Sequence, residues 1–124
     1  MFGRIRISKA DELFSKYIRL RDKFTCQRCG KYYPEGKGLQ CSHFFGRTKK
    51  SVRFDERNCI ALCFGCHRFY EKEDREGYRA HMIKWLGEGQ FNALCVAAYN
   101  PQKVDTKMVE MYCKQKLKEL GSDL

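Results

Sequence analysis

The sequence predicts an α+β fold, in which a zinc-stapled ββα unit follows one N-terminal helix and precedes additional C-terminal helices. Two observations define the central unit: CxxC motifs at 26–29 and 63–66, and two short apolar segments between them. Helical periodicity on both sides of this region is the third observation. A length of 124 residues suits one domain. We therefore expect a single domain over 1–124, with its zinc-stapled core at 8–75 and a helical extension at 76–124.

The first predicted helix covers residues 9–22. Ser8 is a suitable N-cap, and Asp11 falls in the first turn, where the helix dipole favours a carboxylate. Tyr17 and Ile18 belong to an apolar face that repeats at helical spacing. We expect this face to pack against the zinc-stapled unit.

The cysteines of the two CxxC motifs are candidate ligands of a structural zinc ion. Each motif places two thiolates on one tight turn, and Gly30 can take the positive φ that such a turn needs. Structural Zn²⁺ favours a closed tetrahedral shell of this kind. The predicted ligands are Cys26, Cys29, Cys63 and Cys66. The other four cysteines lie singly in apolar surroundings, so the pattern favours free thiols in a reducing cytoplasm over a secreted disulfide scaffold.

The segment between the motifs predicts two antiparallel strands, at 39–44 and 58–62, joined by a basic loop at 46–53. A helix is expected from 63 to about 73, and it would carry the last two cysteines and the residues after them. The predicted order is therefore a CxxC turn, a strand, a loop, a strand and a helix, with the zinc ion at the base of the unit.

Three further amphipathic stripes predict helices beyond residue 74, with stop signals at Gly87, at Asn100-Pro101 and at Gly121. The stripes are Tyr78, His81, Met82, Trp85 and Leu86; Phe91, Leu94, Cys95 and Ala98; and Met108, Met111, Tyr112 and Leu120. We interpret all three as core and packing surface, and His81 as a helix residue outside any functional site.

The formal net charge of +10 is concentrated in the first part of the chain. Residues 1–72 hold 17 Lys and Arg against 7 Asp and Glu, whereas residues 73–124 hold 8 of each. Because the basic part also carries the cysteine motifs, we expect a polyanionic partner. A generic basic protein is the alternative that composition leaves open. No apolar run reaches the roughly 18 residues that would predict a membrane-spanning helix.

Two histidines and one asparagine lie within or beside the zinc-stapled loop. Hydrolysis of a phosphodiester requires that a water is deprotonated and that charge on the phosphoryl and leaving oxygens is neutralised. An imidazole suits the first task and a divalent ion the second. His43 ends the first predicted strand and His67 lies on the following helix, so they can face each other across the ββα unit. Asn58, on the second strand, can hold the loop or orient the imidazole.

The order His43, Asn58, His67 resembles the motif of the HNH (ββα-metal) endonucleases, and the two CxxC motifs resemble the zinc-stapled branch of that superfamily. The segments Tyr-Ile-Arg-Leu-Arg-Asp at 17–22 and Arg-Phe-Asp-Glu-Arg-Asn at 53–58 are similar to the NinG family of phage recombination proteins. The resemblance covers the predicted core and not the C-terminal helices. It implies a ββα-metal core with a treble-clef-like zinc, and a phage or prophage role in DNA processing or recombination.

The resemblance also implies roles for single residues. His43 is expected to be the general base that activates water, Asn58 to position the catalytic loop, and His67 to bind a catalytic Mg²⁺ or Mn²⁺. The family often has Asp or His immediately before the base, where this chain has Ser42. Glu71, one helical turn after His67, is a plausible substitute as the second metal ligand, and Asp55 and Glu56 are weaker candidates.

The implied activity is nicking of DNA, with one strand cut per site, so the chain is expected to act as a monomer or a homodimer. The products would carry 5′-phosphate and 3′-hydroxyl ends. The expected phosphate contacts come from the basic loop: Arg47, Lys49, Lys50 and Arg53. The alternative is a zinc-stapled nucleic-acid-binding module without catalysis, which explains the cysteines and the charge but gives the histidines no role. Either would act in the cytoplasm of a bacterial or phage-infected cell.

Overall fold

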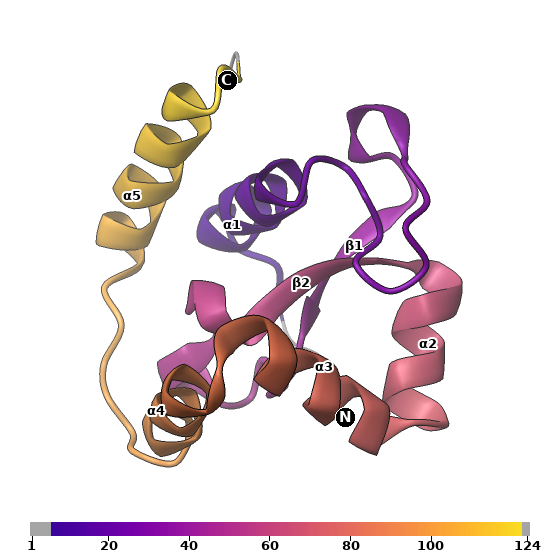
Figure 1. The fold of residues 1–124 in the computed structure, drawn as a ribbon. Coiled ribbons are helices and arrows are strands. Elements are labelled where there is room, and N and C mark those ends of the chain that lie inside the picture. Colours follow the sequence, from indigo (N-terminus) through magenta and orange to yellow (C-terminus); the bar gives the residue numbers. More distant parts are fainter. Residues whose placement is uncertain (1–5, 123–124) are drawn as a thin grey trace.

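The computed structural model describes residues 6–122, and within them it shows a two-stranded antiparallel sheet surrounded by five α-helices (Figure 1). In chain order the elements are α1 (Lys9–Arg21), β1 (Leu39–His43), β2 (Cys59–Cys63), α2 (Phe64–Lys72), α3 (Arg75–Leu86), α4 (Glu88–Ala98) and α5 (Thr106–Glu119), with short 3₁₀ turns at Pro34–Gly36, Lys50–Val52 and Glu56–Asn58. This mixture confirms the predicted α+β class. That β1, β2 and α2 form an HNH ββα-metal core stays a prediction.

The sheet separates two hydrophobic clusters. His43 lies opposite Cys59, and Ser42 lies opposite Ile60. Successive side chains of a strand point to opposite faces. Cys59 therefore packs into the cluster under α1 and α5, whereas Ile60 packs into the cluster under α2, α3 and α4.

Helix α1 begins as the sequence predicts. The hydroxyl of Ser8 accepts a hydrogen bond from the N–H of Asp11 at 3.2 Å, and the Asp11 carboxylate accepts one from the N–H of Ser8 at 2.8 Å. This reciprocal pair is a capping box. The apolar face of α1, which includes Phe14 and Ile18, is buried between the sheet and α5. The predicted packing of α1 on the central unit is confirmed, and α5 shares the same face.

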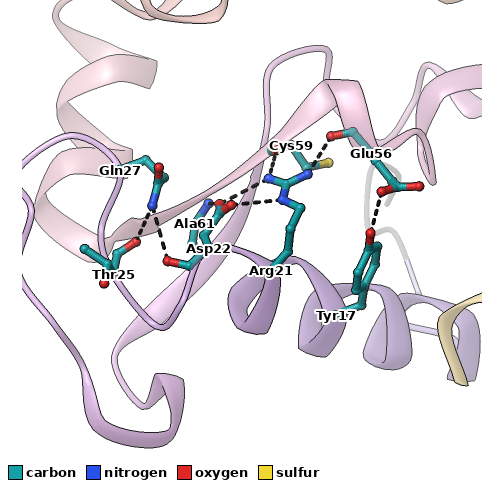
Figure 2. Close-up of polar contacts among 8 residues, drawn as sticks. All are labelled: Tyr17, Arg21, Asp22, Thr25, Gln27, Glu56, Cys59 and Ala61. Atoms are coloured by element: carbon teal, nitrogen blue, oxygen red, sulfur yellow. Dashed lines mark hydrogen bonds and ion pairs between the residues drawn. The ribbon is translucent and has the colours of Figure 1, made fainter. Parts of the chain in front are cut away.

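The end of α1 is tied to the outer edge of β2 (Figure 2). Arg21 donates to the backbone oxygens of Glu56 at 2.9 Å and of Cys59 at 2.7 Å. The Asp22 carboxylate pairs with Arg21 and accepts the N–H of Ala61 at 2.8 Å. The bonded groups of Cys59 and Ala61 belong to β2 and point away from β1. The end of α1 therefore covers one edge of the sheet, and β1 lies along the other. The Glu56 carboxylate also accepts hydrogen bonds from Tyr17 at 2.5 Å and from Tyr112 of α5.

Helices α3 and α4 bury the stripes predicted for them, with Tyr78 and Met82 fully buried on α3 and Phe91 on α4. Gly87, at φ 85°, separates the two helices where the sequence predicted a stop. Trp85 departs from its stripe: its ring is partly exposed and lies under the guanidinium of Arg21 at 4.9 Å. No helix of residues 6–122 is long and apolar enough to cross a membrane.

The stripe predicted for α5 is wrong. Its members are exposed to solvent: Met108, Met111, Tyr112 and Leu120. The buried face consists of Cys113 and Leu117, with Val109 partly buried beside them. The spacing explains the difference, because Val109, Cys113 and Leu117 keep the i, i+4 repeat through three turns, whereas the predicted stripe meets polar Gln115 and Glu119 after its first turns.

Candidate functional site

A cleft of about 1060 Å³ runs along β1 between α1 and α2. It brings together the predicted site residues of β1 and of α2. His43 lines it from β1, and His67 and Glu71 line it from α2. Four cations complete the lining: Arg19, Arg47, Arg68 and Lys72. The site is therefore an open, positively charged groove with two imidazoles and one carboxylate in its wall.

A hydrogen bond to one ring nitrogen fixes the tautomer of His43. Its Nε2 lies 2.8 Å from the carbonyl oxygen of Arg53. A carbonyl only accepts, so Nε2 carries the proton and Nδ1 keeps a lone pair. Burial lowers the pKa of His43, although the hydrogen bond to Arg53 opposes this. The imidazole, which packs 6.1 Å from the ring of Phe14, is therefore neutral at neutral pH and able to accept a proton.

Asn58 holds the loop between the strands. Its side chain is fully buried. Its Oδ1 accepts from the N–H of Phe45 at 2.8 Å, and its Nδ2 donates to the carbonyl oxygens of Phe45 at 2.9 Å and Val52 at 3.1 Å. Of the two roles that the sequence left open, this geometry matches loop holding. The fastened loop supplies the Arg53 carbonyl that orients His43, so Asn58 acts on the imidazole indirectly.

Ser42 fixes the orientation of His67. The Ser42 hydroxyl is fully buried and lies 2.9 Å from Nδ1 of His67 and 2.6 Å from the hydroxyl of Tyr78. Nε2 of His67 is the nitrogen left for the cleft. Ser42 is therefore placed to hold the imidazole, as outer partners of metal-binding histidines do. That Ser42 itself binds the ion stays a prediction.

Glu71 is close enough to His67 to influence its ionisation. Burial lowers the pKa of His67, and the Glu71 carboxylate opposes that shift. An imidazole and a carboxylate one helical turn apart share a face of α2, so both could contribute to binding a divalent ion. Arg75 approaches the same carboxylate at 3.9 Å, while its guanidinium also donates to the carbonyl of Phe44 and lies 4.1 Å from the centre of the Phe44 ring.

The predicted DNA contacts of the basic loop are dispersed in the structure. Only Arg47 lines the cleft. The Lys49 ammonium lies 4.0 Å from the centre of the Tyr99 ring, and Lys50 borders a different hollow near residues 101–106. The Arg53 guanidinium forms a largely buried ion pair with Asp11 at 2.6 Å, so it is not free to contact phosphate.

Three cleft cations were not among the predicted contacts: Arg19, Arg68 and Lys72. Arg68 and Lys72 could have been predicted from the sequence, because they follow His67 on a helix that the sequence did predict. Arg19 lies on α1, and only the packing of α1 against the sheet brings it to the cleft.

The four CxxC cysteines converge as predicted. Their Sγ atoms lie within 4.8 Å of one another. Gly30, at φ 80°, closes the first turn, and its N–H donates to the carbonyl of Cys26 at 2.8 Å. Arg28 donates to Sγ of Cys66 at 3.3 Å, which places a positive charge beside the cluster.

The ionisation of these thiols suits a metal ion. Burial opposes ionisation of Cys63, but the backbone N–H of Cys66 and neighbouring thiols outweigh it and lower the pKa of Cys63 to about 7. Burial raises the pKa of Cys66 to about 12, although Arg28 opposes this. One thiolate forms readily, whereas a second needs a cation to offset burial and repulsion. The four residues could therefore hold a structural Zn²⁺.

Comparison with known proteins identifies the family. A family model described as "Bacteriophage Lambda NinG protein" matches residues 4–123. Searches of curated proteins and of solved structures gave no match. The matched range contains the cleft, the cysteine cluster and also the C-terminal helices, to which the sequence resemblance did not extend. Because this range covers nearly the whole chain, the protein belongs to the family of the bacteriophage lambda NinG protein.

Proposed function

We propose that this protein is a metal-dependent DNA endonuclease that nicks phosphodiester bonds in phage or prophage DNA processing or recombination. The observation that carries the proposal is the single cleft lined by His43, His67 and Glu71 together with four cations. A neutral imidazole, a candidate divalent-ion site and a positive groove are the parts that phosphodiester hydrolysis needs. The resemblance of the chain to the HNH motif supports the same reading.

In the proposed reaction His43 takes a proton from the attacking water at Nδ1. The hydrogen bond from Nε2 to the Arg53 carbonyl keeps Nδ1 unprotonated and stabilises the imidazolium that forms. The buried Asn58 amide maintains this arrangement by holding the loop.

His67 and Glu71 would hold the catalytic Mg²⁺ or Mn²⁺, with Ser42 orienting the imidazole. When bound, the ion supplies Lewis-acid stabilisation of charge on the phosphoryl and leaving oxygens. Because an imidazole is a better ligand for a transition ion, we expect Mn²⁺ to support activity at least as well as Mg²⁺.

The cleft cations are assigned to the DNA backbone. Arg47, Arg68 and Lys72 line the same cleft as the two imidazoles, which supports a role in contacting phosphates. Phosphate contacts position DNA without reading its sequence, so we expect binding that weakens steeply with salt.

The test is incubation of supercoiled plasmid with the purified protein and Mg²⁺ or Mn²⁺. We expect open-circle product, its suppression by EDTA, and its absence from His43→Ala purified in the same way. The matched control is His81→Ala, because His81 lies on α3 beside Tyr70, away from the cleft. This control should nick as the wild type does.

A gel-shift assay with DNA from the same plasmid distinguishes the nuclease from the non-catalytic binding module. If the wild type shifts DNA in a salt-dependent manner yet yields no open-circle product with either metal, the protein is a binding module and the nuclease proposal fails. If His43→Ala nicks as fast as His81→Ala, the general base is misassigned or the activity is a contaminant.

A further inference from the structure

Two of the cysteines that the sequence treats as single are neighbours in the fold. Cys41 lies two residues before His43 on the same face of β1, and Cys59 lies opposite His43 on β2. The ligand atoms of these three residues lie within 4.8 Å of one another. The strand register therefore gathers two thiols and one imidazole at a single point, on the opposite face of the sheet from Ser42.

This cluster is open to the cleft on one side. Cys41 and His43 line the cleft, whereas Cys59 is fully buried behind them under α1. An ion could enter from the cleft side and meet the buried thiol last. A fourth coordination position would then face the cleft and its water.

The imidazole is already arranged as a metal ligand would be. Metal-binding histidines commonly donate their second ring N–H to a backbone carbonyl, which fixes the tautomer and orients the ring. Nε2 of His43 makes such a bond to Arg53, at 2.8 Å, and leaves the Nδ1 lone pair available.

We propose that Cys41, His43 and Cys59 form a second metal site, separate from the CxxC cysteines, that takes a thiophilic divalent ion such as Zn²⁺. Binding releases the two thiol protons to solvent and leaves two thiolates and one neutral imidazole on the ion, so the site carries no net charge. This ligand set selects Zn²⁺ over Mg²⁺ and Ca²⁺, which prefer oxygen.

The second site has a regulatory consequence that rests on the proposed nuclease function. Occupation by Zn²⁺ uses the Nδ1 lone pair that hydrolysis needs. Zinc binding here and proton abstraction by His43 exclude each other. Zn²⁺ beyond the structural equivalent should therefore inhibit nicking, and a chelator too weak to strip the four-cysteine site should restore it.

Binding is tested without reference to activity. Protein that contains one equivalent of zinc, with its thiols reduced, is titrated anaerobically with Co²⁺ while thiolate-to-cobalt absorbance is recorded. We expect a second metal equivalent with this absorbance, while elemental analysis shows that the first zinc is retained. Cys41→Ser should lose this second metal equivalent, because it removes one of the proposed ligands. Cys41 is only partly buried, so its replacement leaves the core intact. Cys95→Ser, a partly buried cysteine on α4, is the matched control and should keep it.

Loss of a direct ligand should weaken binding by at least the roughly 10–100-fold that loss of an outer partner costs. The proposal is overturned if the wild type takes up no second equivalent, or if Cys41→Ser binds it as Cys95→Ser does. Cys59→Ala supplies a second variant, because it removes the buried thiol without placing a polar group in the core.

The inhibition is measured as the free Zn²⁺ concentration that halves nicking, relative to the activity of each variant in Mn²⁺ alone. We expect this concentration to rise at least about tenfold in Cys41→Ser compared with Cys95→Ser. Equal values would refute the regulatory role while the cobalt titration still decides the site. If the protein proves not to be a nuclease, the titration stands by itself, so the two failures are distinguishable.

Discussion

The loop that connects the two strands should depend on one buried amide. Asn58→Ala removes three side-chain hydrogen bonds of 2.8, 2.9 and 3.1 Å from a site with no solvent exposure. It leaves the N–H and the carbonyl of Phe45 without these partners, whereas the Val52 carbonyl keeps the hydrogen bond from the N–H of Asp55 at 3.1 Å. An unsatisfied buried polar group costs about 1–3 kcal/mol, so the two groups of Phe45 predict a loss of about 2–4 kcal/mol. Against a usual stability of about 5–15 kcal/mol, this is a large fraction.

The assay is urea denaturation followed by far-UV circular dichroism on zinc-loaded protein. The matched control is Asn92→Ala, since Asn92 is exposed on α4 and its replacement should change the free energy of unfolding by no more than about 0.5 kcal/mol. A loss below about 1 kcal/mol for Asn58→Ala would refute the reasoning, because it would mean that the N–H and the carbonyl of Phe45 find other partners.

Three further predictions concern DNA affinity, backbone strain and acid stability. Arg68→Ala should lower DNA affinity and reduce the slope of log affinity against log salt by about 0.9, whereas Lys114→Ala on α5 should change neither in a filter-binding titration. Lys23, two residues beyond the end of α1, has φ 57°, a conformation that favours glycine, so Lys23→Gly should raise the free energy of unfolding by about 0.5–1 kcal/mol in urea, and a decrease would contradict this. Burial raises the pKa of Asp11, but hydrogen bonds from Arg53 and Ser8 outweigh it and hold that pKa below its usual 3.8. The stabilisation is therefore complete above the unfolded value and is lost as pH falls through the folded one, so between about pH 4 and pH 2 the wild type should lose more stability than Asp11→Asn, and parallel losses would refute this.

Local signals predicted most of the fold. The N-cap at Ser8, the glycines at positions 30 and 87, and the two short strands are decided by near neighbours, and the structure confirms them. The stripe predicted on α5 is wrong because its large apolar side chains do not keep the helical repeat along the whole helix. Val109, Cys113 and Leu117 keep the repeat, although a cysteine in that position is a weak hydrophobic signal.

The site was only partly predictable for a different reason. His43 is part of β1, and His67 and Glu71 are part of α2, so the prediction of one strand and one helix is enough to bring them to one cleft. The partner of Arg53 is on α1, and the neighbour of Cys41 is on the opposite strand at a diagonal register position. Such pairings depend on tertiary packing, which spacing along one chain segment does not encode.

We propose His43 as the general base of a metal-dependent nick. The most direct test is the single-turnover nicking rate with protein in excess over plasmid and Mn²⁺ saturating, for His43→Ala and His81→Ala. General-base catalysis contributes about 10²–10⁴-fold, so His43→Ala should be slower by at least that lower figure, with unchanged DNA affinity and with 5′-phosphate and 3′-hydroxyl ends on the wild-type product. Equal single-turnover rates for the two variants would contradict the account.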